Sequence, residues 1–322
     1  MSNRAFAIFL ALATAAWLTA CGPPQSTQPF SGTHLGTNLG PARFGPNAKT
    51  NGDLIYVSDL NAFTVSVYSF SGEFLGLLTG LAQPDGMCTD ATGNVYIVDF
   101  QSAVIKAYAH NSGVAFKTLK DPNFTPTSCG IDPKSGDLAV TNDGNGTGGS
   151  GNVAIYTKAK GNPKFYSGSN VDAPFFCGYD DKGNLFVDGG TANSSVIGLA
   201  ELPAGQAALK DLKLKPKLQF PGDIAWDGNY VDVADAGSGI IYSITVSGSS
   251  ASVKRKIELA GGLPIFEYAF VGSELIGAAV ETASPATGDV AVWRYPGGGF
   301  PARRFGSLAL PFGVAVSVPP PH

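Results

Sequence analysis

The chain has 322 residues, of which 14% are charged and 42 are glycine, and its net charge at pH 7 is −4. A charged fraction this far below the roughly 25% of an average domain, together with so many glycines, indicates short strands joined by tight turns. The longest basic run covers only residues 254–256. No surface able to neutralise a phosphate backbone is therefore expected, which excludes nucleic acid as a partner.

Residues 1–20 have the pattern of an export signal. Arg4 provides the positive start, and residues 5–17 form an apolar run too short to span a bilayer permanently. The sequence LTAC at residues 18–21 follows directly and resembles the lipobox of bacterial lipoproteins. The resemblance implies cleavage before Cys21, a diacylglyceryl thioether on its sulfur and a fatty acid such as palmitate on its amino group. Several acyl chains would give a stable membrane anchor. The alternative is an ordinary secretory signal with an incidental cysteine.

The segment that begins at the cysteine has the composition of a tether. Gly22, rather than Asp, follows Cys21, and in the sorting pattern of Gram-negative lipoproteins this favours the outer membrane. Residues 21–50 are rich in Pro, Gly, Ser, Thr and Asn and carry little periodic apolar signal, so they cannot bury enough surface to offset their ordering entropy. We therefore expect a lipidated Cys21 and a flexible tether, with the rest of the chain in the periplasm or outside the cell.

From residue 51 onward the chain repeats. A proline opens a short apolar run that ends six residues later, usually on Asp, and successive prolines are 42, 48, 47, 43 and 47 residues apart. A period in the forties that is made of short strands is typical of a β-propeller, because one such unit cannot bury both faces of its sheet alone. The runs begin at Pro84, Pro126, Pro174, Pro221, Pro264 and Pro311.

The second repeat shows the unit most clearly. It predicts strands over residues 87–90, 94–99, 104–109 and 115–119, with Gly93 at positive φ in the first turn. Alternating β-branched and aromatic residues in these strands suit sheets that stack face to face.

The two ends of the repeat region complement each other. Residues 52–80 supply three strands with no proline-led strand before them, whereas residues 311–317 supply a proline-led strand with nothing after it. We therefore predict an all-β, six-bladed β-propeller over residues 51–318, closed by pairing of the C-terminal strand into the first blade, with residues 319–322 as a tail. Five blades, with residue 264 onward as an appendage, is the alternative.

Residues 83–97 and 182–188, with a strand-initiating proline and turn glycines, resemble NHL-repeat and gluconolactonase-type propellers. The resemblance implies that the first strand of each blade lines a central channel and begins at the face that binds ligands. Asp85, Asp223 and Glu267 would then lie at the channel mouth among apolar side chains, a composition typical of small-molecule sites. The alternative is that these acids cap strands or line a water-filled channel.

The same resemblance raises the question of an enzyme. Gluconolactonase-type enzymes hold a divalent metal with a channel Glu, an Asn and an Asp, and Glu267 and Asp223 would supply two such oxygens. Only the Pro-Asp-Gly sequence around Asp85 matches a motif of that family, and its opening Glu and its Pro-Asn-Gly asparagine have no counterpart here. Histidines occur only at positions 34, 110 and 322, outside the predicted channel strands. The sequence thus predicts no catalytic set, no metal and no other cofactor.

Short polar side chains recur at the end of the second strand of each repeat. Asp59, Asp99, Asn142 and Asp235 all occupy this position. Two interpretations are open: a ring of cation ligands, or side chains that accept hydrogen bonds from loop amides.

Three cysteines follow the predicted lipidated one. Cys129 and Cys177 occupy the same position in adjacent repeats and are the candidate disulfide for an oxidising envelope. Cys88 lies one position off in the preceding repeat and competes as a partner, and three buried thiols is the remaining alternative.

We therefore expect a lipid-anchored propeller that acts as a non-catalytic binding or scaffold module and presents its channel mouth to a protein, peptide or glycan. One alternative is a metal-dependent hydrolase or lactonase that uses Asp223 and Glu267. Another is a structural component of an envelope assembly complex.

Overall fold

The computed structural model describes residues 52–122, 124–146, 149–192, 196–261, 264–281 and 287–319. The predicted signal sequence, Cys21 and the tether lie outside the described residues. Within those ranges, no helix has the length and apolar character needed to cross a membrane.

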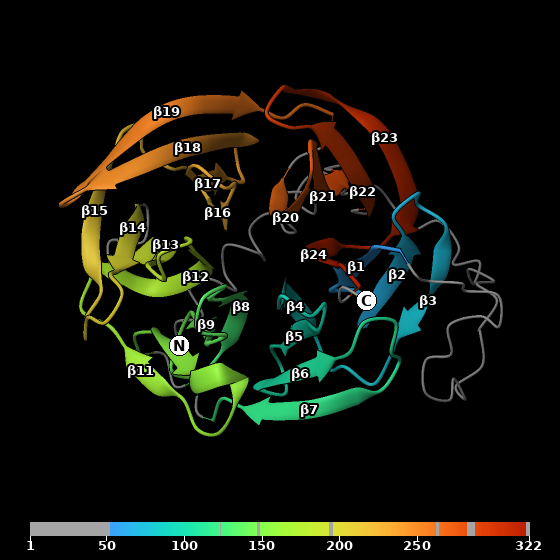
Figure 1. Cartoon of the computed structure of the whole chain (residues 1–322), viewed down its shortest axis with the longest axis horizontal. Helices are drawn as coiled ribbons and strands as arrows, with labels where there is room; N and C mark the ends of the chain where they lie inside the picture. Colours follow the sequence, from blue (N-terminus) through green and yellow to red (C-terminus); the bar gives the residue numbers. More distant parts are fainter. Residues whose placement is uncertain are drawn as a thin grey trace, which may run out of the picture.

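The protein is built almost entirely of strands, and its sheets are arranged around a common axis in a propeller-like ring (Figure 1). Four of the sheets have four strands each. The first two contain, in hydrogen-bonded order, β24 (Pro311–Ser317), β1 (Leu54–Asp59), β2 (Thr64–Ser69) and β3 (Phe74–Leu78), then β4 (Pro84–Thr89), β5 (Val95–Asp99), β6 (Val104–Tyr108) and β7 (Ala115–Lys120). The other two contain β8 (Pro126–Ile131), β9 (Leu138–Asn142), β10 (Asn152–Tyr156) and β11 (Lys164–Tyr166), then β20 (Ile265–Val271), β21 (Glu274–Glu281), β22 (Thr287–Arg294) and β23 (Gly298–Leu308).

The fifth sheet has eight strands and consists of two meanders. They are β12 (Val171–Tyr179), β13 (Leu185–Thr191), β14 (Ile197–Leu202) and β15 (Lys210–Leu214), and β16 (Pro221–Trp226), β17 (Val231–Asp235), β18 (Ile240–Ser247) and β19 (Ser250–Glu258). Only the outermost strands β15 and β19 join them, in parallel, through the pairs Lys213–Ser250 and Leu214–Ala251. A single turn of 3₁₀ helix, η1 (Thr157–Ala159), follows β10.

The predicted strands of the second repeat are confirmed by β4 to β7, and Gly93 has the expected positive φ, 80°. The Asp that ends most of the proline-led runs has a local role. Asp180 accepts hydrogen bonds from the backbone N–H groups of Lys182 and Asn184, each at 2.9 Å, and Asp90 binds Thr92 in the same way. The carboxylate thus fixes the turn between the first and second strands.

The C-terminal strand pairs with the first strand of the described chain. β24 runs antiparallel to β1, with Leu54 opposite Ser317 and Val57 opposite Val314. The sheet β24-β1-β2-β3 therefore combines residues from both ends of the repeat region, as the sequence predicts.

The acids that end the second strands accept hydrogen bonds from loop amides, which is one of the two predicted interpretations. The loop that leads into each first strand passes these buried carboxylates, so its N–H groups and the acids satisfy each other. Leu310, Gln83 and Phe220 donate their backbone N–H to Asp59, Asp99 and Asp235, at 3.1, 2.8 and 3.0 Å. Asn142 differs, because its amide donates to Asn152 instead.

The apolar core lies between neighbouring sheets, and its geometry corrects the predicted disulfide. The structure joins Cys129 to Cys88, with Cα atoms 5.6 Å apart, and leaves Cys177 as a buried free thiol. Cys129 packs with Tyr96 on the preceding sheet, and Cys177 packs with Ala139 on the sheet that precedes its own. Residues at the same position therefore point the same way around the ring, so the side chain of Cys129 points away from Cys177.

Cys88 is the partner of Cys129 because it lies one position away from the aligned cysteine position in its own repeat. Successive residues of a strand point to opposite faces. Met87 belongs to the cluster shared with the β24-β1-β2-β3 sheet, whereas Cys88 packs against the cluster that contains Cys129. The prediction of a Cys129–Cys177 bond is wrong for this reason.

We expect peptide mapping after alkylation without reductant to recover a peptide linking Cys88 to Cys129 and to find Cys177 alkylated only after denaturation. Replacing both Cys88 and Cys129 with serine should lower the free energy of unfolding by about 2–4 kcal/mol, because the bridge restricts the unfolded chain. Cys177→Ser is the matched control for thiol removal in the core. A Cys129–Cys177 peptide would contradict the packing argument.

Candidate functional site

Glu267 lies on the axis of the ring and joins strands of three other sheets. It is on β20 and only 1% exposed. Its Oε2 accepts the backbone N–H of Met87 at 3.0 Å and of Val314 at 3.1 Å, and its Oε1 accepts the hydroxyl of Ser128 at 2.6 Å. One carboxylate thus holds the innermost strands β4, β24 and β8 together.

Two glycines make room for this carboxylate. A Cβ on Gly86 would collide with Oε1 of Glu267, and a Cβ on Gly313 would lie 2.9 Å from Oε2. Both glycines belong to proline-led runs, two residues after the proline. Their missing side chains allow the main chain to approach the acid closely.

Asp223 links two further innermost strands. This half-buried residue of β16 accepts the N–H of Tyr268 on β20 at 3.2 Å and of its own neighbour Ile224 at 2.8 Å. Asp85, on β4, is 6% exposed, and its Oδ1 has no hydrogen-bond partner. The structure therefore places the predicted mouth residues Asp85, Asp223 and Glu267 on the axis, where two of the three bind the main chain of neighbouring sheets.

Asp188 is an axial acid that the sequence argument did not select. It lies on β13, is fully buried, and accepts the N–H of Phe176 at 3.2 Å and of Gly222 at 3.0 Å. A signal was available, because Asp188 occupies the same second-strand position as Asp99 and Asp235.

Burial raises the pKa of these carboxyls. The pKa values of Asp85, Asp188 and Glu267 lie well above their ordinary values, and that of Asp223 rises to about 7. For Glu267 the nearby Asp223 adds to the effect of burial. Folding therefore makes each of these carboxyls harder to ionise. Within the described ranges, no three His, Cys, Asp or Glu side chains are grouped so that they could hold a metal ion.

Phenylalanine rings fill the axis at the end where the innermost strands begin, which we call the proline end. Phe312 of β24 stacks on Phe266 of β20 and on Phe176 of β12, with ring centroids 4.8 and 5.9 Å apart. Phe175 packs beside them, and all four side chains are buried. The proline end of the axis is thus filled by buried aromatic side chains.

A cleft lies at the opposite end, where the innermost strands finish, which we call the turn end. It has a volume of 520 Å³ and separates the two meanders of the eight-stranded sheet. Its base is apolar and includes Phe186, Ile244 and the partly exposed Trp226, while Lys182 and Glu201 are among its polar walls. An apolar base with a few polar groups is the usual composition of a binding pocket. No pattern in the sequence predicts this cleft, because its walls come from separate turns.

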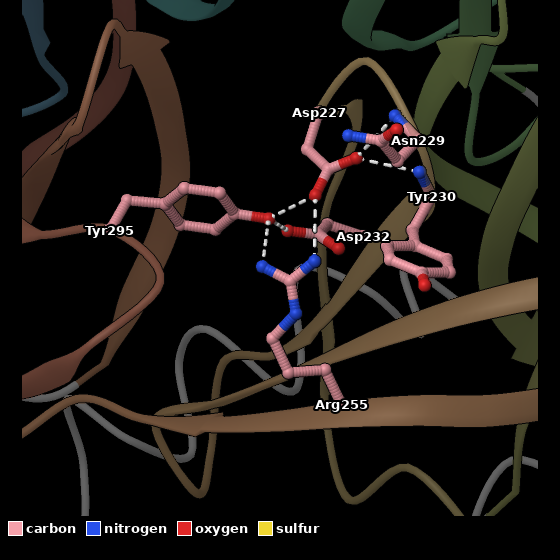
Figure 2. Close-up of polar contacts among 6 residues, drawn as sticks. All are labelled: Asp227, Asn229, Tyr230, Asp232, Arg255 and Tyr295. Atoms are coloured by element: carbon pink, nitrogen blue, oxygen red, sulfur yellow. Dashed lines mark hydrogen bonds and ion pairs between the residues drawn. The ribbon is translucent and has the colours of Figure 1, made fainter.

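A polar network holds one wall of this cleft (Figure 2). The turn after β16 contains Asp227, whose Oδ1 accepts the N–H groups of Asn229 and Tyr230 at 2.7 and 2.6 Å. Its Oδ2 accepts the hydroxyl of Tyr295 at 2.5 Å and the guanidinium of Arg255 at 3.2 Å. Tyr295 follows β22, so the network ties the eight-stranded sheet to its neighbour.

The hydroxyl of Tyr295 also lies 2.7 Å from Oδ2 of the buried Asp232. One hydroxyl proton cannot serve two carboxylates, so the arrangement is satisfied when Asp232 is protonated and donates to Tyr295, which donates to Asp227. Burial raises the pKa of Asp232 to about 6, and hydrogen bonds from Tyr295 and the backbone lower that of Asp227. Both directions agree with this proton arrangement.

No protein-family model matches this sequence, and no curated protein matches it. Solved structures do. A chain of a nidogen–laminin complex superposes with a TM-score of 0.61 at 13% identity, covering 83% of this chain and 99% of that one. A protein of unknown function from Bacteroides caccae gives 0.61 at 10% identity, with the same coverage. A streptogramin B lyase gives 0.49 at 15% identity, covering 80% and 74%. The likeness to the first two structures shows a β-propeller fold.

Replacing Glu267 with Gln should keep the hydrogen bonds to β4 and β24 while removing the titrating group. Because folding raises the pKa of Glu267, the folded form binds this proton more tightly than the unfolded one. Stability from this group is therefore present at low pH and lost as the pH rises above about 4.5. We expect urea denaturation between pH 5 and 9 to show a shallower loss of stability in Glu267→Gln than in the native chain.

The surface residue Glu73 provides the matched control, and Glu73→Gln should leave the pH profile unchanged. A Glu267→Gln variant that is destabilised equally at every pH would show that the carboxylate is ionised throughout.

Replacing Tyr295 with Phe removes the hydroxyl between Asp227 and Asp232 and should cost about 1–3 kcal/mol of unfolding free energy, since Asp227 loses its donor and the protonated Asp232 loses its acceptor. The loss should be smaller in an Asp232→Asn background, because a neutral amide cannot ionise beside Asp227 once the hydroxyl is gone, and a double-mutant cycle measures the difference. Tyr230→Phe is the control, because its ring lies beside Arg255 but its hydroxyl takes no part in these bonds (Figure 2). Equal costs for the two tyrosine variants would count against the shared proton.

Proposed function

We propose that this chain is a lipid-anchored, six-bladed β-propeller of the bacterial cell envelope, of the NHL-repeat or gluconolactonase type, and that it acts as a non-catalytic binding module. Two observations support the blade count. The eight-stranded sheet consists of two four-stranded meanders joined by only two residue pairs, and β24 completes the sheet of β1. Six four-stranded units then form the ring, closed by the C-terminal strand.

The observation that supports a non-catalytic binding role is that the axial carboxylates already bind other parts of the protein. Glu267, Asp223 and Asp188 accept hydrogen bonds from the main chain or a serine of neighbouring innermost strands. Their oxygens therefore accept hydrogen bonds from within the propeller, and phenylalanine side chains fill the axis next to them. The cleft at the turn end offers a concave surface in which Asp180 and Asn184 bind local loop amides and Trp226 is partly exposed.

The proposed anchor rests on the LTAC sequence at residues 18–21, with residues 21–50 as the tether and Gly22 favouring the outer membrane. The propeller would then face the periplasm or the exterior. A protein, peptide or glycan of the envelope would be bound in the cleft, with an apolar part against Trp226 and polar groups toward Lys182 and Glu201.

A photo-crosslinking amino acid in place of Lys182 should capture this partner in intact cells. Lys134 provides a matched control, because it occupies the same turn position two residues after Asp132, and its N–H binds that Asp as Lys182 binds Asp180. Lys134 does not line the cleft. We expect an adduct at position 182 that is absent at position 134 and is lost on Trp226→Ala.

Equal adducts at both positions would show non-specific contact. The absence of any protein or glycan adduct at position 182 would overturn the cleft as the binding site.

A further inference from the structure

Exposed apolar side chains gather at one end of the ring. Among the described residues, eight large apolar side chains are exposed. Five of them lie at the turn end, namely Phe74, Val114, Phe116, Phe300 and Val318.

The strand register fixes this placement. Phe74 lies opposite Tyr68, which lies opposite Ile55 and, beyond it, Val316 near the finish of β24. Phe116 follows Ala115 on β7, whose register leads across β6 and β5 to Thr89, the last residue of β4.

Phe300 follows Gly298 on β23, which pairs through Arg294 and Glu274 with Val271, the last residue of β20. Phe63, in contrast, precedes Thr64, whose register leads to the start of β24 at the proline end.

The three phenylalanines also share one arc of the ring. They lie on the outermost strands β3, β7 and β23, which belong to three neighbouring sheets (Figure 1). Their side chains are 54, 52 and 80% exposed, in the order Phe74, Phe116 and Phe300. The sheets that carry the cleft lie outside this arc.

The described chain begins at the same place. β1 starts at Leu54, opposite Ser317, so the polypeptide enters the ring at the turn end and in the middle sheet of the arc. Residues 21–51 precede this point, so a lipid on Cys21 would be joined to the ring at this end.

We propose that the arc formed by Phe74, Phe116 and Phe300 rests on the membrane surface. This inference depends on the proposed lipid anchor to bring the arc to the bilayer. Isolated phenyl rings at the rim of a folded domain suit shallow insertion at the boundary of headgroups and acyl chains. They are separated along the rim, which fits a flat lipid surface better than a compact protein pocket.

Tryptophan reporters test the proposal in the full-length protein purified from membranes. Phe74, Phe116, Phe300 and Phe63 are each replaced with Trp, and each protein is placed in vesicles of phosphatidylethanolamine and phosphatidylglycerol that contain a brominated phospholipid. All four positions are at least 49% exposed, so the substitutions are tolerated in the same way and Phe63→Trp is the matched control.

We expect bromine quenching of the added Trp to be about threefold stronger or more at positions 74, 116 and 300 than at position 63. Equal quenching at all four positions, or none at the three arc positions, would overturn the proposal. Protection of the arc tryptophans from aqueous iodide without bromine quenching would mean that protein covers the arc, and this too would overturn it.

A separate measurement tests the proposed lipid anchor. A native chain purified from membranes whose intact mass contains no acyl groups would overturn the proposed lipid anchor. The reporter comparison can then still be made by adding brominated vesicles to the purified protein, and its result decides the arc proposal alone.

Discussion

At the inner edge of every sheet, backbone N–H groups need hydrogen-bond acceptors that the sheet itself does not supply. The innermost strand of a sheet has one side without a strand partner, and its N–H groups face the axis, where burial without an acceptor costs free energy. Irregular register at the start of these strands, as between Pro84 and Met87, adds N–H groups that the ladder does not use. Glu267, Asp188 and Asp223 supply the missing acceptors. Glu267 and Asp223 each bind a strand of another sheet, and Asp188 binds the second meander of its own eight-stranded sheet. The axial carboxylates therefore both satisfy the edges and hold neighbouring four-stranded units together.

The sequence could predict the parts of the structure that depend on repeated or local patterns, but not the contacts that the axial acids make over long distances in the chain. The period of the prolines, the strand pattern and the complementary chain ends predicted the strands of the second repeat and the pairing of β24 with β1. The second-strand acids were also predictable, since a short carboxylate beside a loop finds backbone donors locally. The role of Glu267 was not, because its partners Met87, Ser128 and Val314 are 180, 139 and 47 residues away.

The disulfide shows a second limit. Repeats align residues by position, and aligned positions suggested that Cys129 and Cys177 are neighbours. Alignment, however, also makes their side chains point in the same direction around the ring. A cross-link between adjacent sheets needs side chains that point toward each other, which an odd offset provides, and Cys88 has that offset from Cys129. The cleft was unpredictable for a related reason, because its walls are turns and hairpins whose proximity only the assembled ring determines.

The two ends of the ring have different physical characters. At the proline end, loop amides are bound by second-strand acids and the axis is filled by stacked phenylalanines. At the turn end, a cleft beside Trp226 opens between the two meanders of the eight-stranded sheet. The network of Asp227, Asp232 and Tyr295 fixes the turn that borders this space, with the hydroxyl of Tyr295 between the two carboxyl groups. A rigid wall beside an open cleft lowers the entropy lost on binding, because the wall is ordered before a partner arrives. In the proposed binding role, the polar groups buried between the sheets would therefore contribute by fixing the shape of a surface that they do not themselves form.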